Sequence, residues 1–127
     1  RSRQVFHNVF QRAKELIYID SGNSKASGQV ICGVRRSGKT FYQPVASLYP
    51  EVLEQTDKFP TELSCAEASI SAPQTIAANL AAATIVTIHI YNILAEGNNH
   101  SVGKSVFSTK SVNIQSFKKN VKRRKAA

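Results

Sequence analysis

The chain has 127 residues, of which 42% are hydrophobic and 20% charged, so it is long enough for one core and is not disordered as a whole. Its net charge is +9, yet residues 97–127 hold eight of the 17 Lys and Arg residues and no acid, which leaves +1 for residues 1–96. Two cysteines, Cys32 and Cys65, exclude a disulfide-built scaffold and form no zinc-binding pattern, so we expect a reducing, cytoplasmic setting and no metal site. Methionine is absent, so we expect a processed or trimmed chain, and no signal-peptide core begins it.

The first half of the chain predicts a helix followed by short strands. Apolar residues at helical spacing over 3–14 predict an amphipathic helix. The nearly continuous apolar run at 16–20 predicts a buried parallel strand. Further predicted elements are strands at 28–34 and 39–43, a helical turn at 45–49 between Pro44 and Pro50, and a polar surface crossover loop at 51–64.

A long uncharged segment, residues 68–95, predicts a helix from Thr75 to Ala95, with Ser71 and Pro73 as start signals and Gly97 as the stop. Its length would span a bilayer. Its six alanines and its polar residues favour a helix buried under a sheet instead, and we predict no membrane partner. We interpret His89, on this helix, as a hydrogen-bonded core residue.

The last part of the chain predicts a β-hairpin over 101–117 with its turn at 108–110. A flexible basic tail follows at 118–127, so we divide the chain into a domain at 1–117 and this tail. The basic cluster at 118–125 leaves nucleic-acid binding as one alternative function, although no aromatic residue beyond Phe117 is interleaved with it.

Residues 33–40, GVRRSGKT, match the phosphate-binding pattern G-x-x-x-x-G-K-[ST] in full. In that interpretation Lys39 would contact the terminal phosphates of a nucleotide and Thr40 would bind magnesium. Such a loop must run into a helix, whereas Pro44 would fall in the second helical turn and remove a needed N–H. We therefore favour a β-turn at 36–39 between antiparallel strands, and keep a P-loop protein using Lys39 and Thr40 as an alternative.

The segment SCAEASISAP, residues 64–73, places Cys65 between a polar loop and a helix start, where backbone N–H groups favour the thiolate. This segment resembles the ThiF/MoeB/HesA family of adenylating enzymes, whose pattern is T-C-x-E-A-G-V-x-x-P before an Ala-rich helix. The residues in register are Ser64, Cys65, Glu67, Ala68, Ile70 and Pro73. Arg3, Ala13, Lys14, the strand at 16–20 and Gly28-Gln29-Val30 follow the family's order with similar spacing. IDSGN at 19–23 and GQVICG at 28–33 are most similar to the ThiF-type proteins of PRTRC gene clusters on mobile elements.

The resemblance covers about residues 1–117 and implies an α/β fold, the C-terminal half of a Rossmann-like domain with a mixed sheet and a long buried helix. It implies an ATP-dependent adenylyltransferase that activates the C-terminal carboxylate of a ubiquitin-like or sulfur-carrier protein, with Cys65 as the acyl acceptor. The family's nucleotide loop and magnesium-binding Asp precede the position of Arg3. ATP and magnesium would therefore bind a part of the domain outside this chain, and we expect the isolated chain to be inactive. A homodimer or a complementary N-terminal half is the implied partner.

Overall fold

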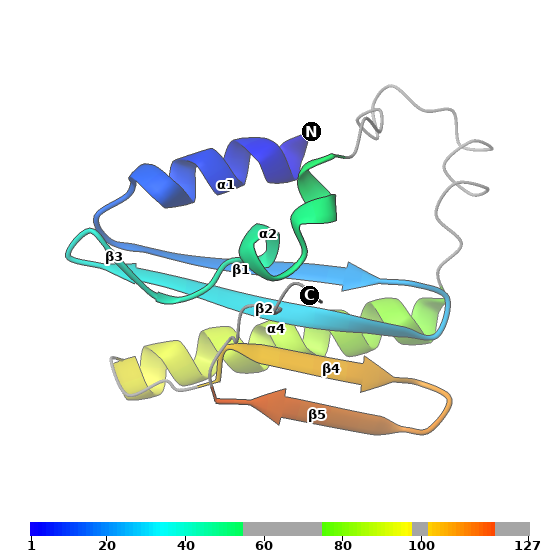
Figure 1. Cartoon of the computed structure of the whole chain (residues 1–127). Helices are drawn as coiled ribbons and strands as arrows, with labels where there is room; N and C mark the ends of the chain where they lie inside the picture. Colours follow the sequence, from blue (N-terminus) through cyan, green and yellow to red (C-terminus); the bar gives the residue numbers. More distant parts are fainter. Residues whose placement is uncertain (55–74, 98–101, 119–127) are drawn as a thin grey trace, which may run out of the picture.

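The computed structural model describes residues 1–54, 75–97 and 102–118, which form a sheet with helices on both faces (Figure 1). The helical elements are α1 (Ser2–Arg12), α2 (Val45–Leu48), the short 3-10 helix η1 (Pro50–Leu53) and α4 (Ile76–Glu96). The strands are β1 (Leu16–Asn23), β2 (Ser27–Arg36), β3 (Lys39–Tyr42), β4 (Lys104–Ser108) and β5 (Asn113–Phe117). The predicted helices and strands in these ranges are confirmed, but the turn of the last hairpin spans residues 109–112 and not the predicted 108–110. The crossover loop beyond Glu54 and the tail beyond Lys118 lie outside the described residues.

The five strands form one sheet in the order β1-β2-β4-β5, with β3 also paired to β2. All four described pairings are antiparallel, so the predictions of a parallel strand at 16–20 and of a mixed sheet are wrong for this part of the chain. The continuous apolar run has another cause: Tyr18 packs against the cluster on one face of the sheet and Ile19 against the cluster on the other. Contacts on both faces produce such a run whichever way the neighbouring strand points although, contrary to the prediction, no residue of β1 is fully buried.

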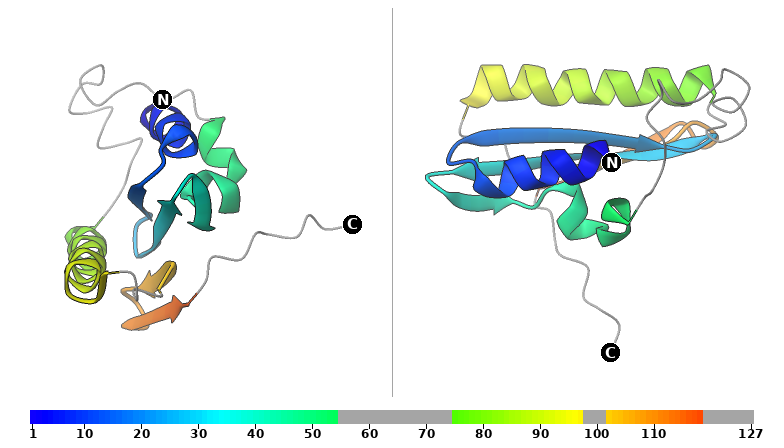
Figure 2. Two further views of the ribbon diagram at one scale, coloured as in Figure 1. Left: turned by 90° about the vertical axis from the view of Figure 1, so that its left-hand side faces the viewer. Right: turned by 90° about the horizontal axis from the view of Figure 1, so that it is seen from above.

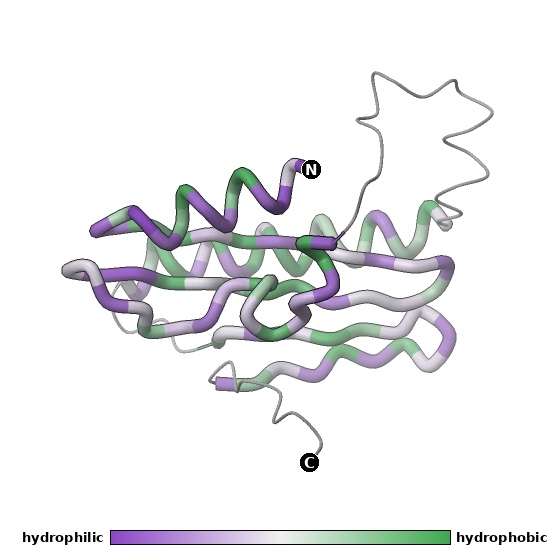
Figure 3. The backbone as a smooth tube through the Cα atoms, turned by 45° about the horizontal axis from the view of Figure 1, so that its top comes forward, coloured by the Kyte–Doolittle hydropathy of each residue, from purple (hydrophilic) through white to green (hydrophobic). Residues whose placement is uncertain are grey.

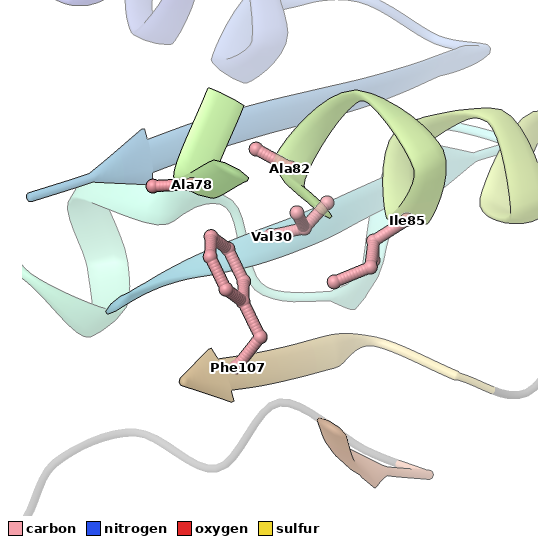
Figure 4. Packing of buried hydrophobic residues seen from close by; sticks show 5 residues of the cluster. All are labelled: Val30, Ala78, Ala82, Ile85 and Phe107. Atoms are coloured by element: carbon pink, nitrogen blue, oxygen red, sulfur yellow. The ribbon is translucent and has the colours of Figure 1, made fainter. Parts of the chain in front are cut away.

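Helix α4 covers one face of the sheet, and α1, α2 and η1 cover the other (Figure 2). Neighbouring residues of the central strand β2 pack into the clusters on opposite faces of the sheet, because successive side chains of a strand point in opposite directions. Val30 packs under α4 with Phe107 and with Ala78, Ala82 and Ile85 of the helix (Figure 4). Ile31 packs against Val45, Ala46, Leu48 and Val52 on the opposite face. The described residues therefore form an α/β/α arrangement with two thin cores.

The long helix begins and ends close to the predicted residues. The Thr75 hydroxyl oxygen accepts a hydrogen bond from the Ala78 N–H at 3.2 Å, which caps the N-terminus, and Gly97 follows the last turn with a φ of 57°. The prediction that this helix is buried is wrong, because only Ala78, Ala82, Ile85 and His89 are buried and much of the remaining surface faces outward. The uncharged sequence reflects an apolar outer face as well as an apolar inner one.

Helix α1 is amphipathic, as predicted, with hydrophobic and hydrophilic residues alternating along its turns (Figure 3). Its inner side buries Phe10 completely against the sheet. The rings of Phe6 and Phe10 lie 5.9 Å and 6.3 Å from the Tyr18 ring in tilted contacts, which fix α1 across β1.

Candidate functional site

The first turn of α1 contacts the C-terminal end of β1 through Arg3. The Arg3 Nε donates to the Asp20 Oδ2 at 3.0 Å, and the Arg3 Nη2 donates to the Ser21 carbonyl oxygen at 3.2 Å. The Arg3 side chain is 28% exposed and the Asp20 side chain 11%, so water only partly screens this ion pair. The pair therefore joins the start of α1 to the strand segment 19–23 that carries part of the family resemblance.

Gly22 and Gln29 complete the same cluster. A Cβ at Gly22 would lie 3.0 Å from the Gln29 Nε2 and 3.3 Å from the Arg3 Nη2, so both side chains pack closely against this glycine. Gly22 and Gln29 are also directly paired in the β1–β2 ladder. We call Arg3, Asp20, Gly22 and Gln29 the Arg3 cluster. It brings together residues from the three motifs of the resemblance that precede the segment 64–73.

Tyr18 adds a hydrogen-bond donor to this cluster, because its hydroxyl donates to the Asp20 Oδ2 at 3.1 Å. Burial, followed by the negative charge of Asp20, raises the pKa of Tyr18, while Arg3 opposes the shift. The phenol therefore stays protonated at neutral pH. Asp20 accepts bonds from both Arg3 and Tyr18, an arrangement that holds the carboxylate in place.

The N-terminus of α4 lies beside the β1–β2 turn. The Thr75 hydroxyl donates to the Lys25 carbonyl oxygen at 2.8 Å, and the Asn23 Nδ2 donates to the Asn79 Oδ1 at 2.6 Å. The segment that contains Cys65 precedes Thr75 in the sequence but lies outside the described residues, so its predicted role as acyl acceptor stays a prediction.

The GVRRSGKT segment is a hairpin, and the predicted β-turn at 36–39 is confirmed. Arg36 pairs with Lys39, and the two residues between them, Ser37 and Gly38, have φ values of 51° and 73°. Positive φ at both positions is the signature of a type I′ turn, and β3 rather than a helix follows. Gly33, at the start of the motif, has a packing role, since a Cβ there would lie 2.9 Å from the Pro44 Cα.

The groups that would bind phosphate and magnesium already have partners within the protein. The Ser37 N–H donates to the Glu15 Oε1 at 2.6 Å, and the Gly38 N–H donates to the Lys14 carbonyl oxygen at 3.1 Å. The Arg35 Nη1 donates to the Thr40 hydroxyl oxygen at 2.8 Å, which places a cation where magnesium would have to bind. Lys39 and Thr40 in this geometry do not fit a nucleotide with its magnesium.

A hydrogen-bonded network runs from the buried residues His89 and Ser105 under α4 to the exposed Ser116, and the sequence did not single out the two serines. The His89 Nε2 lies 3.1 Å from the Ser105 Oγ, which in turn lies 2.8 Å from the Ser116 Oγ. The interpretation of His89 as a hydrogen-bonded core histidine is confirmed. The only sequence signal for Ser105 and Ser116 is the two-residue alternation of the hairpin strands, which places both serines on one face of the hairpin. His89 and Ser105 have the separation of a catalytic Ser–His dyad. Ser105 is buried beneath the helix, however, and we assign these hydrogen-bonded residues a role in packing.

Two cavities adjoin α4. A cavity of about 170 Å³ is lined by His89 and Ser105 together with Ile85, Ile88 and Ile114. A larger cavity, of about 370 Å³, lies between the β2–β3 hairpin and the C-terminal half of α4. Its lining is Ile17, Val34, Arg36, Ser37, Phe41, Tyr42 and Ile93. The sequence predicted neither cavity. In residues 1–54, 75–97 and 102–118, no three His, Cys, Asp or Glu side chains gather in a way that could hold a metal ion.

No protein-family model, curated protein or solved structure matched this chain. Within the part that the structure describes, α4 is the one helix with the length and composition to cross a membrane. Core helices of soluble proteins can have the same length and composition.

Proposed function

We propose that this chain is the C-terminal portion of a Rossmann-like, ThiF-type adenylating domain. Such a domain would use ATP to activate the C-terminal carboxylate of a ubiquitin-like or sulfur-carrier protein. The observation that supports the proposal is the Arg3 cluster: Arg3, Asp20, Gly22 and Gln29 come from three separate motifs of the resemblance and meet at one point. The Arg3–Asp20 contact joins residues 17 positions apart and is not imposed by the β1–β2 hairpin, which by itself pairs Gly22 with Gln29.

An open edge on the sheet supports the same proposal. Among the described residues, the outer edge of β1 has no strand partner, and α1 lies along that side of the sheet (Figure 1). Val5, Phe6 and Val9 of α1 are each more than half exposed there. An edge strand beside an apolar helix face is a site for adding strands. We propose that strands of the nucleotide-binding part of the domain pair with β1 and cover these side chains.

Cys65 is the residue that we propose to accept the activated acyl group. Its thiolate would attack the carbonyl carbon of the acyl adenylate, forming a sulfur–carbon bond, while the bond from that carbon to the phosphate oxygen breaks and AMP leaves. The described cysteine, Cys32, is unsuited to this role because it is buried, and burial raises the pKa of its thiol to about 12.

The acceptor step can be tested without ATP by supplying an acyl group that is already activated. The probe is a short peptide whose C-terminal glycine carries an alkyl thioester, incubated with the full chain at neutral pH. We expect Cys65 to displace the alkyl thiol and gain the mass of the peptide acyl group, in an adduct that neutral hydroxylamine removes, that Cys32→Ala retains and that Cys65→Ser lacks. An adduct that persists in Cys65→Ser, or no hydroxylamine-sensitive adduct in the unmodified chain, contradicts the proposed role of Cys65.

A further inference from the structure

The outward face of α4 carries a regular apolar pattern that no described element covers (Figure 2). Six positions recur at alternating intervals of four and three residues: Ile76, Leu80, Ala83, Thr87, Ile90 and Leu94. All six are exposed, and they lie opposite the buried residues Ala78, Ala82, Ile85 and His89. We call these six residues the α4 seam. A spacing of four and three residues is that of a helix that packs along another helix.

From this pattern we infer that the α4 seam pairs with the α4 seam of a second copy of this chain, with the two helices antiparallel. The order of large and small side chains is the same from either end of the seam. Two large residues lie at each end, and the small residues Ala83 and Thr87 lie at the centre. A twofold interface requires such self-complementarity. Antiparallel pairing about position 85 would place Ile76 against Leu94, Leu80 against Ile90, and Ala83 against Thr87.

The exposed area is sufficient for such an interface. Ile76, Leu80, Ile90 and Leu94 are 78%, 62%, 47% and 81% exposed, and the neighbouring Tyr91 is 70% exposed. These five side chains present on the order of 500 Å² of mostly apolar surface on each copy. Pairing two copies would therefore bury about 1,000 Å², the lower limit expected for a specific interface.

The two threonines on this face do not oppose burial. The Thr87 hydroxyl donates to the Ala83 carbonyl oxygen, and the Thr84 hydroxyl donates to the Leu80 carbonyl oxygen, both at 2.8 Å. Their hydrogen-bonding capacity is used within the helix, so covering them leaves no unsatisfied donor. Between Thr75 and Ala95 there is no charged side chain that a partner would have to desolvate.

A second copy fits these observations better than a lipid surface. Helices that lie on membranes present Lys and Arg along their polar side, and α4 has none. A helix that crosses a membrane would have to leave the sheet, which would break the His89–Ser105 contact and expose Val30 and Phe107. The antiparallel seam keeps these contacts intact.

The oligomeric state tests the proposal directly. We expect sedimentation equilibrium of the full chain to show a reversible dimer, and Leu80→Glu or Ile90→Glu to raise its dissociation constant at least about 30-fold, or roughly 2 kcal/mol. Both side chains are exposed, so both variants should keep the far-ultraviolet circular dichroism of the unmodified chain. The matched control is Val5→Glu, the same type of exchange on the exposed side of α1, which should leave the dimer unchanged.

Disulfide formation tests the direction of the pairing, with Cys65→Ser as the background. Mixing an Ala83→Cys chain with a Thr87→Cys chain should give a cross-linked dimer on mild oxidation, whereas neither variant alone should do so. Cross-linking of Ala83→Cys with itself would overturn the antiparallel arrangement. A chain that stays monomeric at 100 micromolar, a dimer unaffected by both Glu variants, or a monomer whose binding to anionic phospholipid vesicles is lost in Leu80→Glu would overturn the proposed dimer.

Discussion

The His89 Nε2 lies 3.1 Å from the Ser105 Oγ, and both residues are almost completely buried between α4 and the β4–β5 hairpin. This contact is polar, whereas the rest of the α4 core consists of aliphatic residues and Phe107. It favours one position of the helix along the sheet, because sliding α4 by one turn would break the buried His89–Ser105 contact while Ser105 kept only its bond to Ser116.

Removing either partner should destabilise the protein. We expect Ser105→Ala to lower the free energy of unfolding by about 1–3 kcal/mol, and His89→Ala by about 2–4 kcal/mol because it also enlarges the cavity beside this side chain. Thr84→Ala, which removes an exposed hydroxyl on the same helix, should change it by less than about 0.5 kcal/mol. Urea unfolding followed by circular dichroism measures all three. Equal small effects for Ser105→Ala and Thr84→Ala would show that the buried contact does not stabilise the fold.

The hairpin at 36–39 should not bind nucleotide, despite its match to a phosphate-binding pattern. The Ser37 and Gly38 N–H groups and the Thr40 hydroxyl are engaged by Glu15, Lys14 and Arg35. We therefore expect calorimetric titration with Mg-ATP to detect no micromolar binding to the unmodified chain or to Lys39→Ala. Micromolar binding that disappears in Lys39→Ala would restore the P-loop alternative.

Gly33 should tolerate no larger side chain. A Cβ at this position would lie 2.9 Å from the Pro44 Cα and 3.2 Å from a Phe10 ring carbon, so the backbone at Pro44 would have to move. We expect Gly33→Ala to destabilise the fold by about 1–3 kcal/mol or more in urea unfolding. Gly22→Ala is the matched comparison, since it meets only the ends of the Gln29 and Arg3 side chains, and its effect should be smaller. The reverse order would contradict this packing.

Cys32 should be unreactive in the folded protein and should make the fold sensitive to alkali. Burial raises the pKa of its thiol to about 12, above the value near 9 of an exposed thiol. The unfolded chain releases this proton first as the pH rises, so the free energy of unfolding should fall between about pH 9 and 12, by up to about 1.4 kcal/mol per pH unit. Cys32→Ala should reduce this slope, while the slope from Tyr18, whose pKa burial also raises, should remain.

Alkylation gives an independent measurement of the same burial. Limiting iodoacetamide at neutral pH, followed by peptide mass spectrometry, should label Cys65 before Cys32, and Cys32 should react only when the protein unfolds. Labelling of Cys32 at a similar or greater rate in the folded protein would contradict the packing of β2.

The sequence predicted the local elements well because their signals are local. The apolar spacing of α1 and the two residues at the β2–β3 turn each specify a structure within a few positions. Strand direction depends on partners distant in the chain, and Tyr18 and Ile19 give the same apolar run in either direction. The exposure of α4 was missed for a similar reason, since hydropathy does not distinguish a face packed on a sheet from one turned outward.

Of the candidate site, the sequence supplied the residues but not their arrangement. Arg3 and Gln29 belong to motifs 26 positions apart, and only the β1–β2 ladder and the placement of α1 bring them to Gly22. The link between His89 and Ser105 likewise depends on how α4 crosses β4.

Arg35 links the β2–β3 hairpin to the end of α1, and this link matters when a tag or label is inserted into the protein. Its guanidinium donates to the carbonyl oxygens of Ala13 and Gly38 and to the Thr40 hydroxyl oxygen, each at 2.8 Å. The exposed tip of the β2–β3 hairpin is therefore held to the end of α1, and an epitope or fluorophore sequence inserted there would pull on that helix. The turn between β4 and β5 is anchored as well, because the Thr109 N–H and hydroxyl donate to the Ala26 carbonyl oxygen at 2.7 Å and 2.8 Å, so an insertion there should follow Thr109.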